Sequence, residues 1–181
     1  MRWRRPCIGD WVRRPAPVGQ YLPVASVGFR VGYPAMTSAV RYLQVAPGEA
    51  SLPDLGGFPP FRAVVLVREI VSNDWRNRVS DWLVAAGCLY MLAWGRECSL
   101  WDDAVDWANI SAFDFKPIPP ERFVMTTWHE DDPMEEVFWF AKNCAEHPTI
   151  PLDLDLILDI ASVAREAETM NAWTAAVATD S

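Results

Sequence analysis

The chain has 181 residues, which is long enough for one well-packed domain and short for two. Apolar residues make up 51% of it and charged residues 22%, which excludes the charge-rich, apolar-poor composition of a disordered chain. The longest uninterrupted apolar run, over 88–94, is far shorter than the roughly 18–20 residues of a membrane span, so we expect no membrane association.

Charge is distributed unevenly along the chain. The first 35 residues carry six arginines, one acid, five prolines and four glycines, a net charge of +5. This composition predicts a disordered basic extension over 1–35; the alternative is a basic arm that contacts nucleic acid or the rest of the chain. Residues 36–181 hold the remaining ten basic and 23 acidic residues, net −13, and are predicted to form a single acidic domain.

The first half of that domain begins with two predicted strands. Residues 40–45 are expected to form a short edge strand, and a Gly/Pro-rich connection follows over 47–60. The β-branched run over 63–67 is typical of a strand buried on both faces of a parallel sheet. Ser72 or Asn73 is predicted to cap a helix that ends near Gly87, and 88–93 forms the next strand.

The second half continues the alternation of strands and helices. Capping boxes at Ser99–Asp102 and Asp132–Glu135 predict one helix to about Asn109 and another to Cys144. Strands are predicted over 123–127 and 154–160. A last helix is expected to bury one apolar stripe, formed by Val163, Ala167, Met170 and Val177.

This alternation predicts an α/β fold with three layers. Right-handed crossovers between parallel strands place helices on both faces of an open, mainly parallel sheet of four or five strands, which is flavodoxin-like or Rossmann-like. The sequence has no G-x-G-x-x-G after the first buried strand and no G-x-x-x-x-G-K-[ST] motif, so it lacks both of these phosphate-binding devices. The four cysteines form no C-x-x-C pair, which favours a reducing compartment and a cytoplasmic location.

Acidic residues follow two of the predicted strands. In open α/β sheets ligands bind at the carboxyl ends of the strands, where Glu69, Glu130 and Asp132 are expected. An acid after one strand and an acid-x-acid after a later strand resembles the Toprim pattern of metal-dependent phosphoryl-transfer domains, although no glycine follows Glu69. The resemblance implies Mg²⁺ or Mn²⁺ on these three carboxylates. Helix capping and solvation are the alternative roles.

A second candidate site combines a thiol with an imidazole. Cys98 precedes a predicted helix, where a thiolate is stabilised, and His129 follows the next predicted strand. Together with Glu69 or Asp102 as an orienting carboxylate, they would supply the nucleophile and the base of a hydrolase. These residue types resemble those of the class I glutamine amidotransferase-like superfamily, but that family's tight nucleophile turn is missing here.

Tryptophans are unusually frequent, with ten in the chain. Trp94, Trp101 and Trp128 lie near the predicted strand ends, and Trp139 falls away from the buried stripe of its helix. Large aromatic rings dominate binding hot spots as well as cores. We therefore consider these four tryptophans as candidate binding residues, with core packing as the alternative.

Two segments point to a family. Residues 88–95, Cys-Leu-Tyr-Met-Leu-Ala-Trp-Gly, and 125–133, Met-Thr-Thr-Trp-His-Glu-Asp-Asp-Pro, resemble a family of small uncharacterised bacterial α/β domains over roughly residues 45–160. The resemblance implies a domain of unknown function and carries no activity.

The acidic charge and the aromatic content favour a binding function. We expect an acidic protein-interaction module, comparable to immunity proteins, that binds a basic protein partner and makes no direct contact with nucleic acid. The alternatives are the metal-dependent phosphoryl-transfer enzyme, the Cys-His hydrolase and a regulatory module that senses a small ligand.

Overall fold

Five strands and four α-helices make up residues 39–178, the part of the chain that this computed structural model describes. The predicted basic extension over 1–35 lies outside these residues. The strands are β1 Ala39–Val45, β2 Phe61–Val67, β3 Cys88–Gly95, β4 Met125–His129 and β5 Leu154–Ile160. The helices are α1 Asn73–Ala85, α2 Cys98–Ala112, α3 Met134–Asn143 and α4 Glu166–Val177, with a 3-10 turn at Pro120–Arg122. No helix in this range is long and apolar enough to cross a bilayer.

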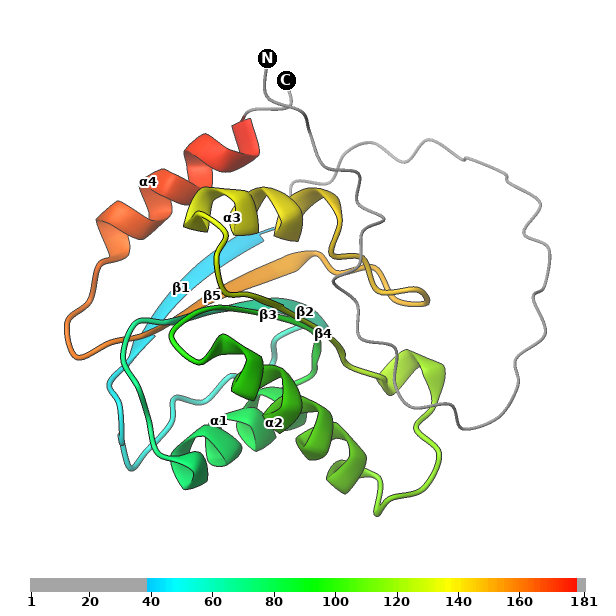
Figure 1. Cartoon of the computed structure of the whole chain (residues 1–181). Coiled ribbons are helices and arrows are strands. Elements are labelled where there is room, and N and C mark those ends of the chain that lie inside the picture. Colours follow the sequence, from blue (N-terminus) through cyan, green and yellow to red (C-terminus); the bar gives the residue numbers. More distant parts are fainter. Residues whose placement is uncertain (1–38, 179–181) are drawn as a thin grey trace, which may run out of the picture.

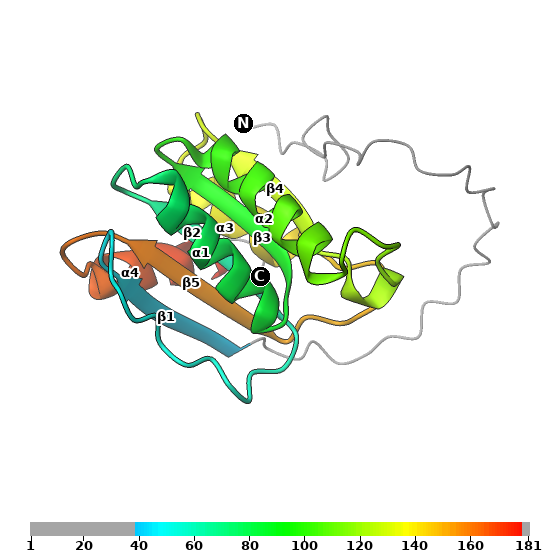
Figure 2. The ribbon, with the colours of Figure 1, turned by 90° about the horizontal axis from the view of Figure 1, so that it is seen from below.

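The strands form one parallel sheet in the order β1-β5-β2-β3-β4. Helices α1 and α2 cover one face and α3 and α4 cover the other (Figure 1), which confirms the three-layer α/β prediction. Seen from the side of α1 and α2, these two helices lie side by side over the sheet (Figure 2). This order is a circular permutation of the flavodoxin-like order 2-1-3-4-5. Strand β1 takes the place of the second flavodoxin-like strand, β2, β3 and β4 take the places of the third to fifth, and β5 with α4 takes the place of the first strand and its helix.

The connection between β1 and β2 takes the place of a crossover helix. It passes on the α1 side, where the side chain of Leu55 is buried in the core. Two indole nitrogens of α1 hold it: Trp75 Nε1 donates to the carbonyl of Glu49 at 3.0 Å, and Trp82 Nε1 donates to that of Pro53 at 2.9 Å. The Gly/Pro-rich segment is thus fixed by side chains of the next helix.

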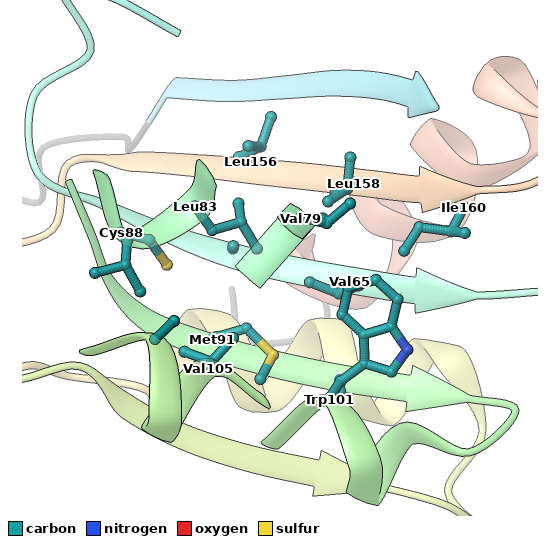
Figure 3. Close-up of a cluster of buried hydrophobic side chains, with 14 of the residues drawn as sticks. Val65, Val79, Leu83, Cys88, Met91, Trp101, Val105, Leu156, Leu158 and Ile160 are labelled. Carbon is teal, nitrogen blue, oxygen red and sulfur yellow. The ribbon is translucent and has the colours of Figure 1, made fainter. Parts of the chain in front are cut away.

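The core beneath α1 and α2 contains many of the largest fully buried side chains. Figure 3 shows Val79 and Leu83 of α1 and Trp101 of α2 over strand residues such as Val65 and Met91. Trp101 is only 1% exposed and meets Trp75 edge to face, with ring centroids 6.4 Å apart. Trp101 is therefore a core residue.

The opposite core lies beneath α3 and α4. Phe138 of α3 and Trp173 of α4 meet edge to face at 5.3 Å over Leu66 and Ile157. The predicted apolar stripe of α4 is wrong in part, because the helix begins at Glu166 and buries Thr169, Trp173 and Ala176. Val163 precedes the helix and is exposed, as is Ala167.

Helix starts depart from the sequence prediction at two of three places. Ser72 caps α1 as predicted, accepting from the backbone N–H of Trp75 at 3.3 Å. The two predicted capping boxes are wrong: α2 begins at Cys98 behind Glu97, α3 begins at Met134 behind Pro133, and neither has a side-chain cap.

The turn that leads into α2 explains its early start. Gly95 (φ +96°) ends β3, and the next backbone N–H, that of Arg96, donates to the carbonyl of Val67 at 2.8 Å. Glu97 then adopts a left-handed conformation at φ +51°, so the chain enters the helix one residue before Ser99.

Candidate functional site

The carboxyl edge of the sheet has its topological switch point between β5 and β2, because the helices that follow these neighbouring strands lie on opposite faces. Arg68 follows β2 here and donates through Nε to Oδ1 of Asp159 at 2.8 Å, and through Nη2 to Oγ1 of Thr169 at 3.0 Å. The hydroxyl of Tyr42 donates to the other oxygen of Asp159 at 2.8 Å. The polar groups at this position are thus bonded to one another.

Burial determines the protonation of this network. Asp159 has no exposed surface, and its ion pair with Arg68 is nearly as inaccessible. Burial, reinforced by the Asp159 carboxylate, raises the pKa of Tyr42 to about 12, so its hydroxyl stays protonated and donates. A second buried ion pair, Arg62 to Asp155 at 2.6 Å, lies at the other end of the same two strands.

Glu69, the second residue after β2, links the two loops at the switch point. Its carboxylate accepts from the backbone N–H of Ser162 at 2.6 Å and from the Ser162 hydroxyl at 2.8 Å, and these bonds lower the pKa of Glu69. The loops after β2 and β5 are thereby joined. Glu69 consequently faces β5, away from the acids that follow β4.

The structure does not bring the three predicted metal ligands together. Strand β3 lies between β2 and β4, which separates their ends by about 9–10 Å, and Glu69 turns to the far side. Asp132 accepts from His129 at 3.0 Å, and Glu130 is exposed. Among residues 39–178, no group of three His, Cys, Asp or Glu side chains is arranged to hold a metal ion.

Cys98 and His129 also do not form a nucleophile and a base. Strand β4 covers Met125–His129, so it begins and ends two residues later than predicted; His129 is its last residue and is buried. Its Nδ1 is paired with Asp132 at 3.0 Å and its Nε2 lies 3.3 Å from Oγ1 of Thr127, so both ring nitrogens are engaged.

The pKa shifts of Cys98 and His129 also argue against a reactive thiolate at this position. Burial lowers the pKa of His129 and raises the pKa of the Cys98 thiol. A nucleophilic cysteine needs the opposite shift, towards the thiolate. The thiol lies against the backbone of His129, and this contact only offsets part of the effect of burial.

The four candidate binding tryptophans differ in exposure. Trp101 is in the core, and Trp128 and Trp139 are half-buried. Trp94 is half-buried too; its Nε1 donates to the carbonyl of Asp132 at 2.8 Å, and the Arg68 guanidinium lies 6.0 Å from its ring centroid. Within the described residues, none of these four is a fully exposed aromatic surface.

The exposed aromatic surface lies instead along α2. Leu100, Asp103 and Trp107 share its outer face by their spacing, and Asp114 and Phe115 follow in the turn after the helix. Trp107 is 62% exposed and Phe115 is 71% exposed. We call these five residues the α2 surface.

The turn that carries Phe115 is strained. Asp114 (φ +52°) and Phe115 (φ +59°) are consecutive non-glycine residues in the left-handed region, which costs roughly 1–2 kcal/mol for each. The backbone N–H groups of Asp114 and Phe115 bond to the carbonyls of Ser111 and Ile110, at 3.0 and 3.2 Å. These hydrogen bonds therefore hold the phenyl ring of Phe115 in an exposed position at an energetic cost. Backbone strain of this kind clusters at functional sites.

The two charged residues of this surface, Asp103 and Asp114, are acids, and Asp114 pairs with Lys116, which follows in the same turn, at 3.4 Å. From Glu97 to Asp114 the chain has five carboxylates and no basic residue. Asp106 lies next to Trp107 in the helix and accepts from the Thr126 hydroxyl at 3.2 Å. Burial, with the neighbouring Asp102 carboxylate, raises the pKa of Asp106 to about 6.

Comparison with known families identifies the chain. The model of a family described as a domain of unknown function, DUF7684, matches residues 40–176, more than half of the sequence. The chain belongs to this family. No match was found among curated proteins or among solved structures.

In this DUF7684 domain, sequence reasoning missed Trp107 and Phe115. The signal for Trp107 was present, because the buried face of α2 contains Trp101, Val105 and Ala108, and position 107 falls opposite to it. Phe115 gave no such signal, since its exposure depends on the left-handed turn that follows the helix.

Proposed function

We propose that this domain is an acidic protein-interaction module and that the α2 surface binds a basic segment of a protein partner. The observation that carries the proposal is the combination of two exposed aromatic rings, those of Trp107 and Phe115, with the exposed carboxylate of Asp103, in a stretch from Glu97 to Asp114 that has five acids and no basic residue. Exposed aromatic side chains of this kind are the usual anchors of protein interfaces.

Electrostatics favours a basic protein over the other partner classes. The negative charge of residues 36–181 repels nucleic acid phosphates and accelerates association with cations in a salt-dependent way. Asp103 lies one turn before Trp107 on the outer face of α2, so an Arg or Lys side chain of the partner would lie over the indole face while it pairs with this carboxylate. Binding would require no closure of the fold, because the surface is already exposed.

The test is to select binders from a random peptide library on the full-length chain. We expect the selected peptides to be enriched in Arg and Lys, and Trp107→Ala to weaken their binding about tenfold or more, the effect of losing a hot-spot tryptophan. Val163→Ala is the matched control, since Val163 is as fully exposed as Trp107, at 69%, but lies in the loop after β5.

Salt provides a second readout. Raising the salt concentration should weaken binding to the wild type, and Asp103→Asn should slow association more than it speeds dissociation. Selected peptides without basic residues, or equal affinity for the Trp107→Ala and Val163→Ala variants, would contradict the proposal.

A further inference from the structure

A pocket lies at the amino-terminal edge of the sheet, at the opposite end of the strands from the switch point. Its volume is about 480 Å³, within the range of small-molecule sites. Arg62 at the start of β2 and Lys142 near the end of α3 contribute to it, and the loop over 146–153 provides most of the wall.

His147 fixes the conformation of that wall. Its Nδ1 accepts from the backbone N–H groups of Thr149 at 3.3 Å and Ile150 at 3.1 Å. Its Nε2 therefore carries the proton and donates to the carbonyl of Phe123 at 2.9 Å. The buried imidazole thus holds the loop from inside, and Pro148 and Pro151 restrict its backbone further. The wall is formed before any ligand arrives, which lowers the entropic cost of binding.

Arg62 supplies a charged donor to the pocket. Its residue is only 5% exposed; Nε donates to Asp155 at 2.6 Å and Nη1 donates to the carbonyl of Ala145 at 2.6 Å. Within residues 39–178, Nη2 is the guanidinium nitrogen for which no acceptor is found. A ligand oxygen that reached Nη2 would complete the hydrogen bonding of a held, buried cation.

The charges around the pocket are balanced. Arg62 and Lys142 contribute two cations, each of which already interacts with another group of the protein, and the exposed Glu146 and Asp153 contribute two carboxylates. Asp155 already neutralises part of the charge of Arg62, so the pocket has no surplus positive charge for a phosphate dianion. Apolar surface comes from Ile150 and Leu152, among others. A small molecule that carries one charge of each sign and an apolar part matches this lining.

We propose that the pocket binds a free amino acid or a short peptide, with its carboxylate on Nη2 of Arg62 and its ammonium group facing Glu146 and Asp153. Apolar side chains of the ligand would lie against Ile150 and Leu152. The site is separate from the α2 surface, so neither proposal depends on the other.

The first test titrates the full-length chain with each of the twenty amino acids and with dipeptides, while amide resonances of residues 146–153 are followed by NMR. Each ligand that binds is then compared with its N-acetyl and its C-terminal amide derivatives. The proposal expects saturable shifts in this loop and a loss of affinity of about tenfold or more for both derivatives. These comparisons leave the protein unchanged, so a folding defect cannot explain the result.

The second test changes the protein at exposed positions. Glu146→Gln combined with Asp153→Asn should weaken binding of the amino acid and leave binding of its N-acetyl derivative unchanged. The control is Glu166→Gln combined with Glu168→Gln, two exposed acids at the first turn of α4. The proposal is overturned if no amino acid or dipeptide shifts the loop at millimolar concentration, if inorganic phosphate produces the same shifts, or if the control variant loses as much affinity.

Discussion

Replacing Asp106 by Asn should stabilise the protein at neutral pH. The pKa of Asp106 rises from 3.8 to about 6 because the side chain is desolvated and lies near Asp102. A shift of this size corresponds to about 3 kcal/mol, and solvent screening of this half-buried side chain reduces it to about 1–2 kcal/mol. The Asn side chain can still accept from the Thr126 hydroxyl, so the native hydrogen bond is retained.

The pH dependence follows from the direction of the shift. A carboxyl whose pKa is raised in the folded state favours folding while it is protonated, and that contribution is lost as pH rises from about 4 through about 6. The free energy of unfolding of the wild type should therefore fall across this window relative to that of Asp106→Asn. The two proteins should be equally stable near pH 4 and differ by about 1–2 kcal/mol at pH 7.5.

The assay is urea unfolding of both proteins between pH 4 and pH 8, with Asp103→Asn as the matched control. Asp103 lies in the same helix but is exposed, so its replacement should give no comparable difference across the window. A stability difference between wild type and Asp106→Asn that is the same at pH 4 and pH 7.5, or a loss of stability at pH 7.5, would refute the reasoning.

Three further predictions concern the sheet. Asp159→Asn should lower the free energy of unfolding by about 3 kcal/mol, because it leaves Arg68 without a buried counter-ion. The control is Asp114→Asn, which breaks only an exposed pair with Lys116 and should cause no measurable loss of stability in the same denaturation assay. Gly95→Ala should destabilise the protein far more than Gly48→Ala. Both glycines have positive φ, but a Cβ at position 95 would lie 2.5 Å from the carbonyl oxygen of Val67, whereas a Cβ at position 48 would contact nothing. Equal losses of stability for the two variants in thermal unfolding would contradict this. Since burial lowers the pKa of His129, its imidazole should remain neutral as pH falls below 6.5 and stability should decline over that range; an NMR titration in which His129 protonates at its ordinary pKa would contradict this.

Much of the fold could be predicted because its signals are local. The β-branched run of β2 and the cap at Ser72 each depend on a few neighbouring residues, and the structure confirms both. The predicted start of β4 is two residues too early. Phe123 and Val124 continue the apolar run of the sequence, but the pairing between β3 and β4 begins only at Met125. That shift determines which residues lie beyond the strand.

The site could be predicted much less well, because it depends on strand order. Residues that follow two successive strands lie close together only if those strands are adjacent in the sheet. The sequence does not determine that β5 lies between β1 and β2. Glu69 therefore meets Ser162 and not Glu130. The sequence predicts that Asp132 caps α3, but its carboxylate instead accepts a hydrogen bond from the buried imidazole of His129.

The position of β1 has a consequence for the order of folding. Among the described strands it pairs only with β5, at one edge of the sheet, so Ala39 meets Leu154 across almost the whole described chain. The run from β2 to β4 needs only neighbouring segments to meet, whereas β1 can join the sheet only after β5 has crossed back beside β2, with a larger loss of loop entropy. We expect β1 to dock last and to open first. Substitutions in β1 should then speed unfolding while they leave the folding rate nearly unchanged, and its amides should be the earliest of the sheet to exchange with solvent.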